Sequence, residues 1–143
     1  MKLTNKQVTN IVIGLSRFSA ERLDKSEKAH LPVGLGMKFA IAKQKLTPHY
    51  EAFEEVRDEL IDEYCKRDDK GQKLKKGAGP SEQWDMGERD AEFKKAYKEL
   101  LLTEVEVERL TPVKFADFKV KEDDLPAEYF DIFASLHPFL ELE

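Results

Sequence analysis

The stretch Phe39–Tyr64, FAIAKQKLTPHYEAFEEVRDELIDEY, decides the fold of this chain. Its apolar side chains recur at every third or fourth residue: Phe39, Ala42, Leu46, Tyr50, Phe53, Val56, Leu60 and Tyr64. This spacing places them along one side of an α-helix, while charged residues occupy the other sides. We therefore predict one long amphipathic helix over about residues 37–66.

Pro48 lies inside this pattern and allows two interpretations. In the first, Thr47 and Pro48 cap and open a new helix, because proline fits the first helical position. In the second, Pro48 kinks one continuous helix. The apolar stripe passes Pro48 without a change of phase, which favours the kink.

A helix-start signal stands near the beginning of the chain. Thr4 suits an N-cap, and Gln7 follows three residues later, as a capping box requires. Leu3 and Val8 occupy the two positions of a hydrophobic staple around that cap. Apolar residues continue at helical spacing, so we predict a first helix over about residues 5–24.

Two segments have the composition of loops. KSEKAHLPVGLG, residues 25–36, is a predicted connector, because Pro32 disfavours helix before it and two glycines loosen the chain. After the long helix, residues 67–83 are polar and rich in lysine and glycine. They predict an exposed basic loop with a small hairpin around DDKGQK, residues 68–73.

The last third of the chain mixes helix and strand signals. A third helix is predicted over about residues 88–102. TEVEVERL, residues 103–110, alternates between apolar and acidic side chains, which is typical of a half-buried strand. VKFADFKV, residues 113–120, is predicted as a second strand rather than a helix, and residues 126–136 as a short last helix.

These elements predict an α+β fold that is mainly helical, with a long kinked amphipathic helix and a small two-stranded β element near the C-terminus. The length fits a single domain over residues 1–143 with its own core. Cys65 is the only cysteine, so no internal disulfide can form and a reducing compartment is expected. The longest apolar run is too short to cross a bilayer, so no membrane partner is expected.

Charge is distributed unevenly along the chain. The net charge is −5, yet residues 66–76 hold six basic and two acidic residues, a local +4. Residues 104–143 hold eleven acidic and four basic residues, a local −7. An acidic protein with one small basic segment is a poor general binder of nucleic acid, because phosphate neutralisation supplies most of that affinity. We therefore expect a protein partner rather than a nucleic acid.

The sequence carries no pattern for catalysis or for a cofactor. Glu55, Asp58 and Asp62 share one side of the long helix, but no E-x-x-H pair accompanies them as in helical metal sites. A solvated face opposite the apolar stripe is the favoured interpretation. The histidines are scattered and favour structural roles. We therefore expect no enzymatic activity, no catalytic residue, no metal and no cofactor.

The first candidate contact surface is the basic loop, through Lys70, Lys73, Lys75 and Lys76, with Trp84 just after it. Lysine and tryptophan together suit a nucleic acid or an acidic protein. An ordinary solvated loop is the alternative.

Two further groups of residues are candidate contacts. Glu104, Glu106 and Glu108 form an acidic row on one face of the predicted strand. The C-terminal segment around Phe139 and Leu140 is so rich in apolar side chains that a second chain could cover some of them. Packing in the chain's own core is the favoured alternative for this segment.

Four stretches together resemble a family of small uncharacterised phage and prophage proteins. They are MKLTNKQVTNIVIGL, LPVGLGMKFAIAKQKLTPHYEAFEEVRDELIDEY, ELLLTEVEVERL and LPAEYFDIFASL. That family is similar in length and order, with a capped first helix and an FAIAK stretch before a long charged helix. GLGM at residues 34–37 and Pro48 depart from its pattern, so a local difference is expected there. The resemblance implies a phage product made in bacterial cytoplasm, and it implies no activity or functional residue.

We therefore expect a non-enzymatic phage protein that acts through protein–protein contacts, as a minor virion component or assembly factor. The alternative is an inhibitor of a host or anti-phage defence protein that binds through an acidic surface. The partner would be a phage or host protein, and a homo-oligomer stays open. The expected location is the host bacterial cytoplasm, with incorporation into the virion as a further alternative.

Overall fold

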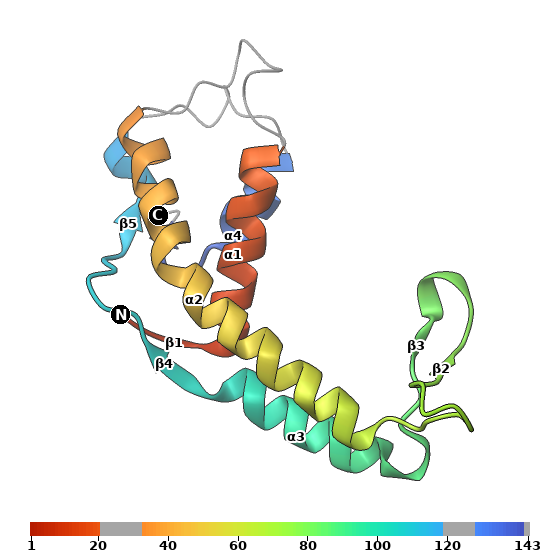
Figure 1. Cartoon of the computed structure of the whole chain (residues 1–143). Helices are drawn as coiled ribbons and strands as arrows, with labels where there is room; N and C mark the ends of the chain where they lie inside the picture. The colour runs from red at the N-terminus through yellow and green to blue at the C-terminus, as the bar shows by residue number, and fades with distance from the viewer. Residues whose placement is uncertain (21–32, 119–127, 142–143) are drawn as a thin grey trace. The chain divides into compact units, whose positions relative to one another are not determined.

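The computed structural model describes residues 1–20, 33–118 and 128–141 (Figure 1). The fold is α+β and mainly helical, as the sequence predicts. Residue contacts divide the chain into two compact units. The first unit comprises Met1–Tyr50 and Glu104–Glu143, and the second comprises Glu51–Thr103. The assignment of residues 1–143 to one domain stays a prediction.

Helix α1 (Asn5–Ala20) begins where the capping box predicts. The Gln7 N–H donates to Thr4 Oγ1 at 3.2 Å, and the Thr4 N–H donates to Gln7 Oε1 at 2.9 Å. Two main-chain donors at the helix start are thereby satisfied by side chains. Residues 21–24, the predicted end of this helix, lie outside the described residues.

Helix α2 (Val33–Tyr64) begins before the predicted residue 37. Its first turn includes Gly34 and Gly36, which the sequence assigns to a connector. Leu35 is 0% exposed, and it extends the buried stripe back from Phe39. Burial of Leu35 outweighs the cost of glycine in a helix, about 1 kcal/mol per residue. Pro48 lies inside α2, so the interpretation in which it opens a new helix is wrong.

The core of the first unit lies among α1, α2 and α4 (Glu128–Ser135). Aromatic rings fill it: Phe18 meets Phe39 edge to face at 5.1 Å between centroids, and Phe39 lies 6.2 Å from Phe139. Phe139 and Leu140 are 2% and 1% exposed. Their assignment as partner contacts is therefore wrong, because the chain's own core covers both side chains. The predicted start of the last helix, residues 126–127, lies outside the described residues.

Two short β pairs belong to the first unit. Strand β1 (Lys2–Thr4) pairs antiparallel with β4 (Glu104–Glu106). Strand β5 (Val113–Lys114) pairs parallel with β6 (Leu140–Glu141). Neither β1 nor β6 is predicted by the sequence pattern.

Both predicted strands near the C-terminus are shorter in the structure. The strand predicted over residues 103–110 ends at Glu106, and Arg109 adopts a left-handed conformation with φ 58° that no strand accommodates. The strand predicted over residues 113–120 ends at Lys114. A 3₁₀ helix, Phe115–Phe118, follows it and buries Phe115, so the prediction is wrong there. Residues 119–120 lie outside the described residues.

The second unit contains the last turns of α2, a small β pair and helix α3 (Asp90–Leu102). The β pair joins β2 (Lys75–Lys76) to β3 (Gln83–Trp84). Helix α3 begins later than the predicted residue 88, because Gly87–Arg89 form a 3₁₀ turn. All residues of this unit are described, and its buried apolar side chains are Phe53, Cys65 and Met86.

Candidate functional site

The predicted basic loop is a hairpin with a defined hydrogen-bond ladder. Lys75 lies opposite Trp84, and Lys76 lies opposite Gln83. The ladder continues toward α2, where the Asp85 N–H donates to the carbonyl of Leu74 at 2.9 Å. The register thus fixes which lysine side chains stand beside Trp84.

Asp68 forms a second, tighter turn between α2 and β2, where Arg67 pairs antiparallel with Lys73. Its Oδ1 accepts hydrogen bonds from the N–H groups of Lys70 at 2.8 Å and Gln72 at 2.9 Å. Gly71 adopts φ 78°, a left-handed conformation that glycine reaches without strain. The Asp68 N–H closes the turn on the Gln72 carbonyl at 2.9 Å. The small hairpin predicted around DDKGQK is therefore confirmed.

Trp84 lies beneath two lysine ammonium groups. Lys75 Nζ is 4.6 Å and Lys73 Nζ is 5.1 Å from the centroid of its ring. A cation over an exposed aromatic face contributes about 0.5–1 kcal/mol. Lys75 also lies 4.0 Å from Glu82. Two of the four predicted contact lysines therefore have partners inside the chain, whereas Lys70 and Lys76 are exposed.

Asp62, in the last turn of α2, forms ion pairs with Arg67 and Lys73 at the two ends of the Asp68 turn. Lys73 Nζ lies 2.7 Å from its Oδ1, and Arg67 Nη2 lies 3.5 Å from the same atom. The hydrogen bond from Lys73, with the charges of Lys73 and Arg67, holds the pKa of Asp62 below its ordinary 3.8, although partial desolvation opposes this.

Three carboxylates of α2 take part in ion pairs: Glu54, Asp58 and Asp62. Asp58 lies 3.3 Å from Arg57, which also bridges to Glu54 at 3.3 Å. Within the described ranges, no three His, Cys, Asp or Glu side chains gather as a possible metal site.

A row of aromatic rings runs along the second unit, and the sequence pattern does not mark it as a contact site. Phe93 stacks on Tyr97 at 5.8 Å, and Tyr64 lies 6.1 Å from Phe93. The Arg89 guanidinium covers the outer face of Tyr64 at 4.2 Å. The helical spacing of Phe93 and Tyr97 could have pointed to this row.

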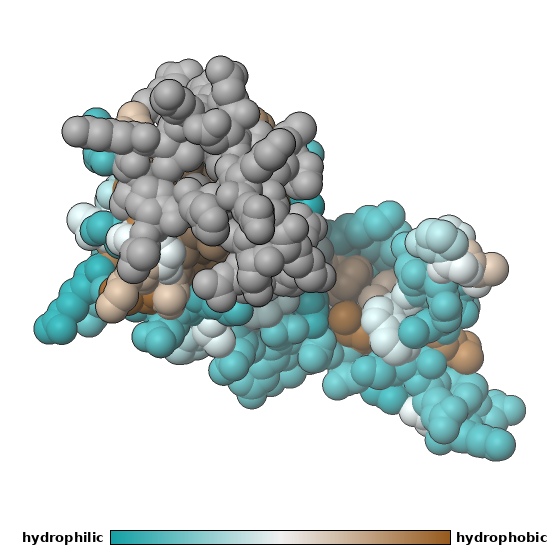
Figure 2. Space-filling model, turned by 90° about the horizontal axis from the view of Figure 1, so that it is seen from above, coloured by the Kyte–Doolittle hydropathy of each residue, from teal (hydrophilic) through white to brown (hydrophobic). Residues whose placement is uncertain are grey.

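Helix α3 buries none of its residues within the chain. Phe93, Tyr97, Leu100 and Leu101 are half-buried, and Leu102 is 55% exposed. Figure 2 shows brown apolar patches within a mainly hydrophilic face of the molecule. The apolar side chains of α3 therefore remain partly open to solvent.

The predicted acidic row lies on β4 and the residues just after it. The side chains of Glu104 and Glu106 are 58% and 61% exposed, and Glu108 is exposed as well. Lys2 Nζ lies 3.8 Å from Glu104, and the Met1 amino group donates to Glu106 Oε1 at 3.1 Å. Two of the three glutamates, Glu104 and Glu106, therefore already interact with cationic groups of β1 and the residue before it.

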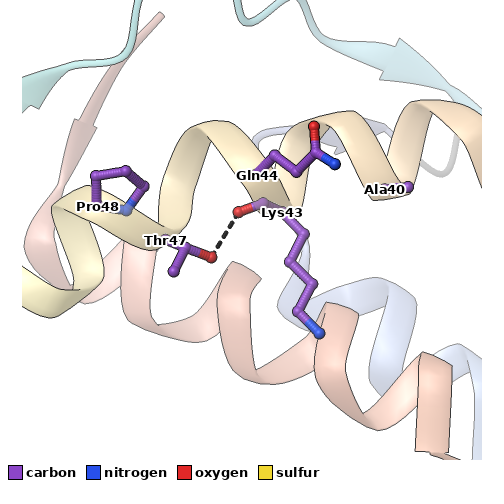
Figure 3. A pocket seen from close by; sticks show the side chains of 5 residues that line it. All are labelled: Ala40, Lys43, Gln44, Thr47 and Pro48. Atoms are coloured by element: carbon purple, nitrogen blue, oxygen red, sulfur yellow. Dashed lines mark hydrogen bonds between the residues drawn. The ribbon is translucent and has the colours of Figure 1, made fainter.

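A hollow on α2 is lined by five residues of that one helix: Ala40, Lys43, Gln44, Thr47 and Pro48 (Figure 3). Thr47 Oγ1 donates to the carbonyl of Lys43 at 2.7 Å. Pro48 has no N–H to give to the Gln44 carbonyl. The hollow is open and mainly apolar, so its described lining offers few groups to orient a ligand.

No protein-family model, curated protein or solved structure matches this chain. None of the helices in the described ranges is both long and apolar enough to cross a membrane. The hairpin, the open face of α3 and the acidic row are therefore interpreted from their own chemistry.

Proposed function

We propose that this chain is a non-enzymatic phage protein that works by binding another phage protein, as a minor virion component or assembly factor. The phage setting rests on the sequence resemblance, and the mode of action rests on the surface of the second unit. The bound surface would combine apolar and acidic groups, because the face of α3 is apolar and the neighbouring hairpin is basic.

The open face of α3 is the observation that carries this proposal. Phe93 and Tyr97 pack against Tyr64 and Phe53 of α2, yet no residue of α3 is buried, so part of this apolar surface stays in water. Leu102, at the end of α3, is 55% exposed. Protein interfaces are enriched in aromatic residues and arginine, and Phe93, Tyr97 and Arg89 stand together here.

The first experiment measures where the protein goes during infection. Quantitative mass spectrometry would compare purified phage particles with the infected-cell lysate. A fixed copy number per particle is the expected result for a virion component. Presence in the lysate with absence from particles at every assembly stage would overturn the proposal.

A pair of variants tests the surface itself. Leu102→Glu places a charge on the open face of α3, and we expect it to lower the copy number in particles at least tenfold. Ile13→Glu changes an exposed residue of α1 in the first unit and is the matched control. Equal incorporation of both variants would show that α3 is not the contact surface.

The acidic row supports a second candidate function, inhibition of a host or defence protein that has a basic surface. Three exposed glutamates, Glu104 and Glu106 on β4 and Glu108 in the turn after it, can bind a basic groove by charge complementarity. Binding of this kind weakens with salt, because a Debye length of about 8 Å at physiological ionic strength screens exposed charges. A host complex that persists unchanged from low to high salt would contradict it.

A further inference from the structure

Strand β4 is paired along one edge and open along the other. The sheet that it forms with β1 has two strands, so each strand has one edge without a β partner among the described residues (Figure 1). An unpaired edge presents N–H and C=O groups in a row that another strand can bond.

The register identifies the groups that face outward. Met1 and Val107 exchange two main-chain hydrogen bonds, of 2.8 Å and 2.9 Å. Pairs of this kind alternate with pairs that point away from each other in an antiparallel ladder. Leu3 and Val105 therefore bond each other, whereas Glu104 and Glu106 direct their N–H and C=O groups to the open edge.

The two edges of this sheet are not equivalent. On the β1 side, the outward N–H of Thr4 is occupied by Gln7 Oε1 through the capping box. On the β4 side, the main-chain groups of Glu104 and Glu106 have no hydrogen-bond partner in the described part of the chain. On β1 only Lys2 keeps outward main-chain groups without such a partner, whereas β4 offers those of both Glu104 and Glu106, so β4 has the longer open edge.

We propose that the open edge of β4 binds an extended segment of another protein in which lysine or arginine alternates with apolar residues. The main chain of that segment adds a third strand to the sheet. Its basic side chains lie beside Glu104 and Glu106 on the solvent face, as Lys2 does on the other side. Its apolar side chains lie beside Val105, which packs against the core.

Charge decides against strand β4 of a second copy as the occupant. Antiparallel pairing of β4 with itself would place glutamate beside glutamate, and like charges directly opposite destabilise a sheet. The same acidic side chains that repel a second β4 attract a basic strand. The chain's own basic segment, residues 73–76, is already paired with Arg67 and residues 83–85. The occupant is therefore a basic segment of a different protein.

This proposal rests on the second candidate function, because it names the kind of segment that the acidic surface would bind. The two are distinguishable, because simple charge attraction needs only the acidic side chains, whereas strand addition also needs the main chain of both partners. The probe is a blocked heptapeptide, Lys-Val-Lys-Val-Lys-Val-Lys, and the protein is the full chain.

The first measurement is amide hydrogen exchange by NMR with and without the peptide. We expect the amides of Glu104 and Glu106 to exchange at least tenfold more slowly when the peptide is bound. The Val105 amide, which already faces Leu3, should change little. Equal effects on all three amides, or none, would overturn the proposal.

The second measurement is the peptide's affinity by calorimetry. The double variant Glu104→Gln/Glu106→Gln should bind the peptide about 2- to 30-fold more weakly. This is the range expected when two cross-strand charge pairs are lost. Glu51→Gln with Glu55→Gln removes the same charge from exposed positions of α2 and should leave the affinity unchanged.

A peptide with N-methyl groups on alternate residues separates the two models. Methylation along the bonding edge should abolish binding if the peptide joins the sheet. Salt-sensitive binding that survives methylation would overturn strand addition while leaving the acidic-surface function in place. No binding by either peptide would contradict both.

Discussion

Gly14 of α1 lies directly against Ser135 of α4. A Cβ atom at Gly14 would stand 2.3 Å from Ser135 Oγ and 2.8 Å from Leu136 Cδ2. Glycine at this position allows the two helices of the first unit to pack closely. We expect Gly14→Ala to destabilise the protein by about 1–3 kcal/mol, the usual cost of overpacking a core. Urea unfolding followed by circular dichroism measures this.

Gly36 is the matched control for that substitution. It lies in the first turns of α2, and a Cβ there would meet nothing within 4 Å. Gly36→Ala should stabilise the protein by about 0.5–1 kcal/mol, because alanine loses less backbone entropy in a helix. If both variants gain stability, α1 and α4 do not pack as closely as described.

The start of α1 depends on the Thr4 hydroxyl. Thr4→Ala removes the acceptor for the Gln7 N–H and should cost about 1 kcal/mol. Thr4→Ser keeps the oxygen and should retain most of that stability. Equal losses in the two variants, measured in the same urea titration, would assign the effect to the methyl group rather than to the cap.

Pro48 leaves one carbonyl of α2 without its helical donor. Pro48→Ala restores an N–H that can reach the Gln44 carbonyl, and we expect it to raise stability by up to about 3 kcal/mol. Pro80 is the control, because it stands in the first turn of the 3₁₀ helix Gly79–Ser81, where a missing N–H costs nothing. Thermal unfolding of both variants tests this, and an unchanged midpoint for Pro48→Ala would contradict it.

The features that could be predicted from the sequence are the local ones. Thr4 and Gln7 are three residues apart, so the sequence of a single turn is enough to predict their capping box. The stripe through Phe39 and Leu46 has a single period and predicts α2 regardless of its surroundings. Asp68 accepts main-chain hydrogen bonds within its turn, and Gly71 adopts the left-handed conformation that the turn needs, so both residue types predict the turn locally.

The features that could not be predicted depend on partners far along the chain. Lys2–Thr4 is a strand only because residues 104–106 lie beside it. A segment of three residues is too short to show the alternation of apolar and polar side chains that predicts a strand. Leu35 makes its turn helical only once the core that covers it is assembled. The composition of the loop marks Lys73, Lys75 and Trp84 as candidates, but the placement of the two ammonium groups over the ring depends on the hairpin register.

The ion pair between Lys73 and Asp62 predicts a specific response to pH. The hydrogen bond and charge of Lys73 lower the pKa of Asp62 below 3.8 in the folded state. The folded state thus binds this proton more weakly, so the pair's contribution is present above the unfolded pKa and is lost as pH falls through the folded pKa. An NMR titration should place the Asp62 carboxyl below 3.8, and Lys73→Met should raise it. Lys94→Met is the control, because it removes the hydrogen bond that lowers the pKa of Asp90 and should leave Asp62 unchanged. If the pKa of Asp62 is unchanged in Lys73→Met, Lys73 does not form this ion pair with Asp62.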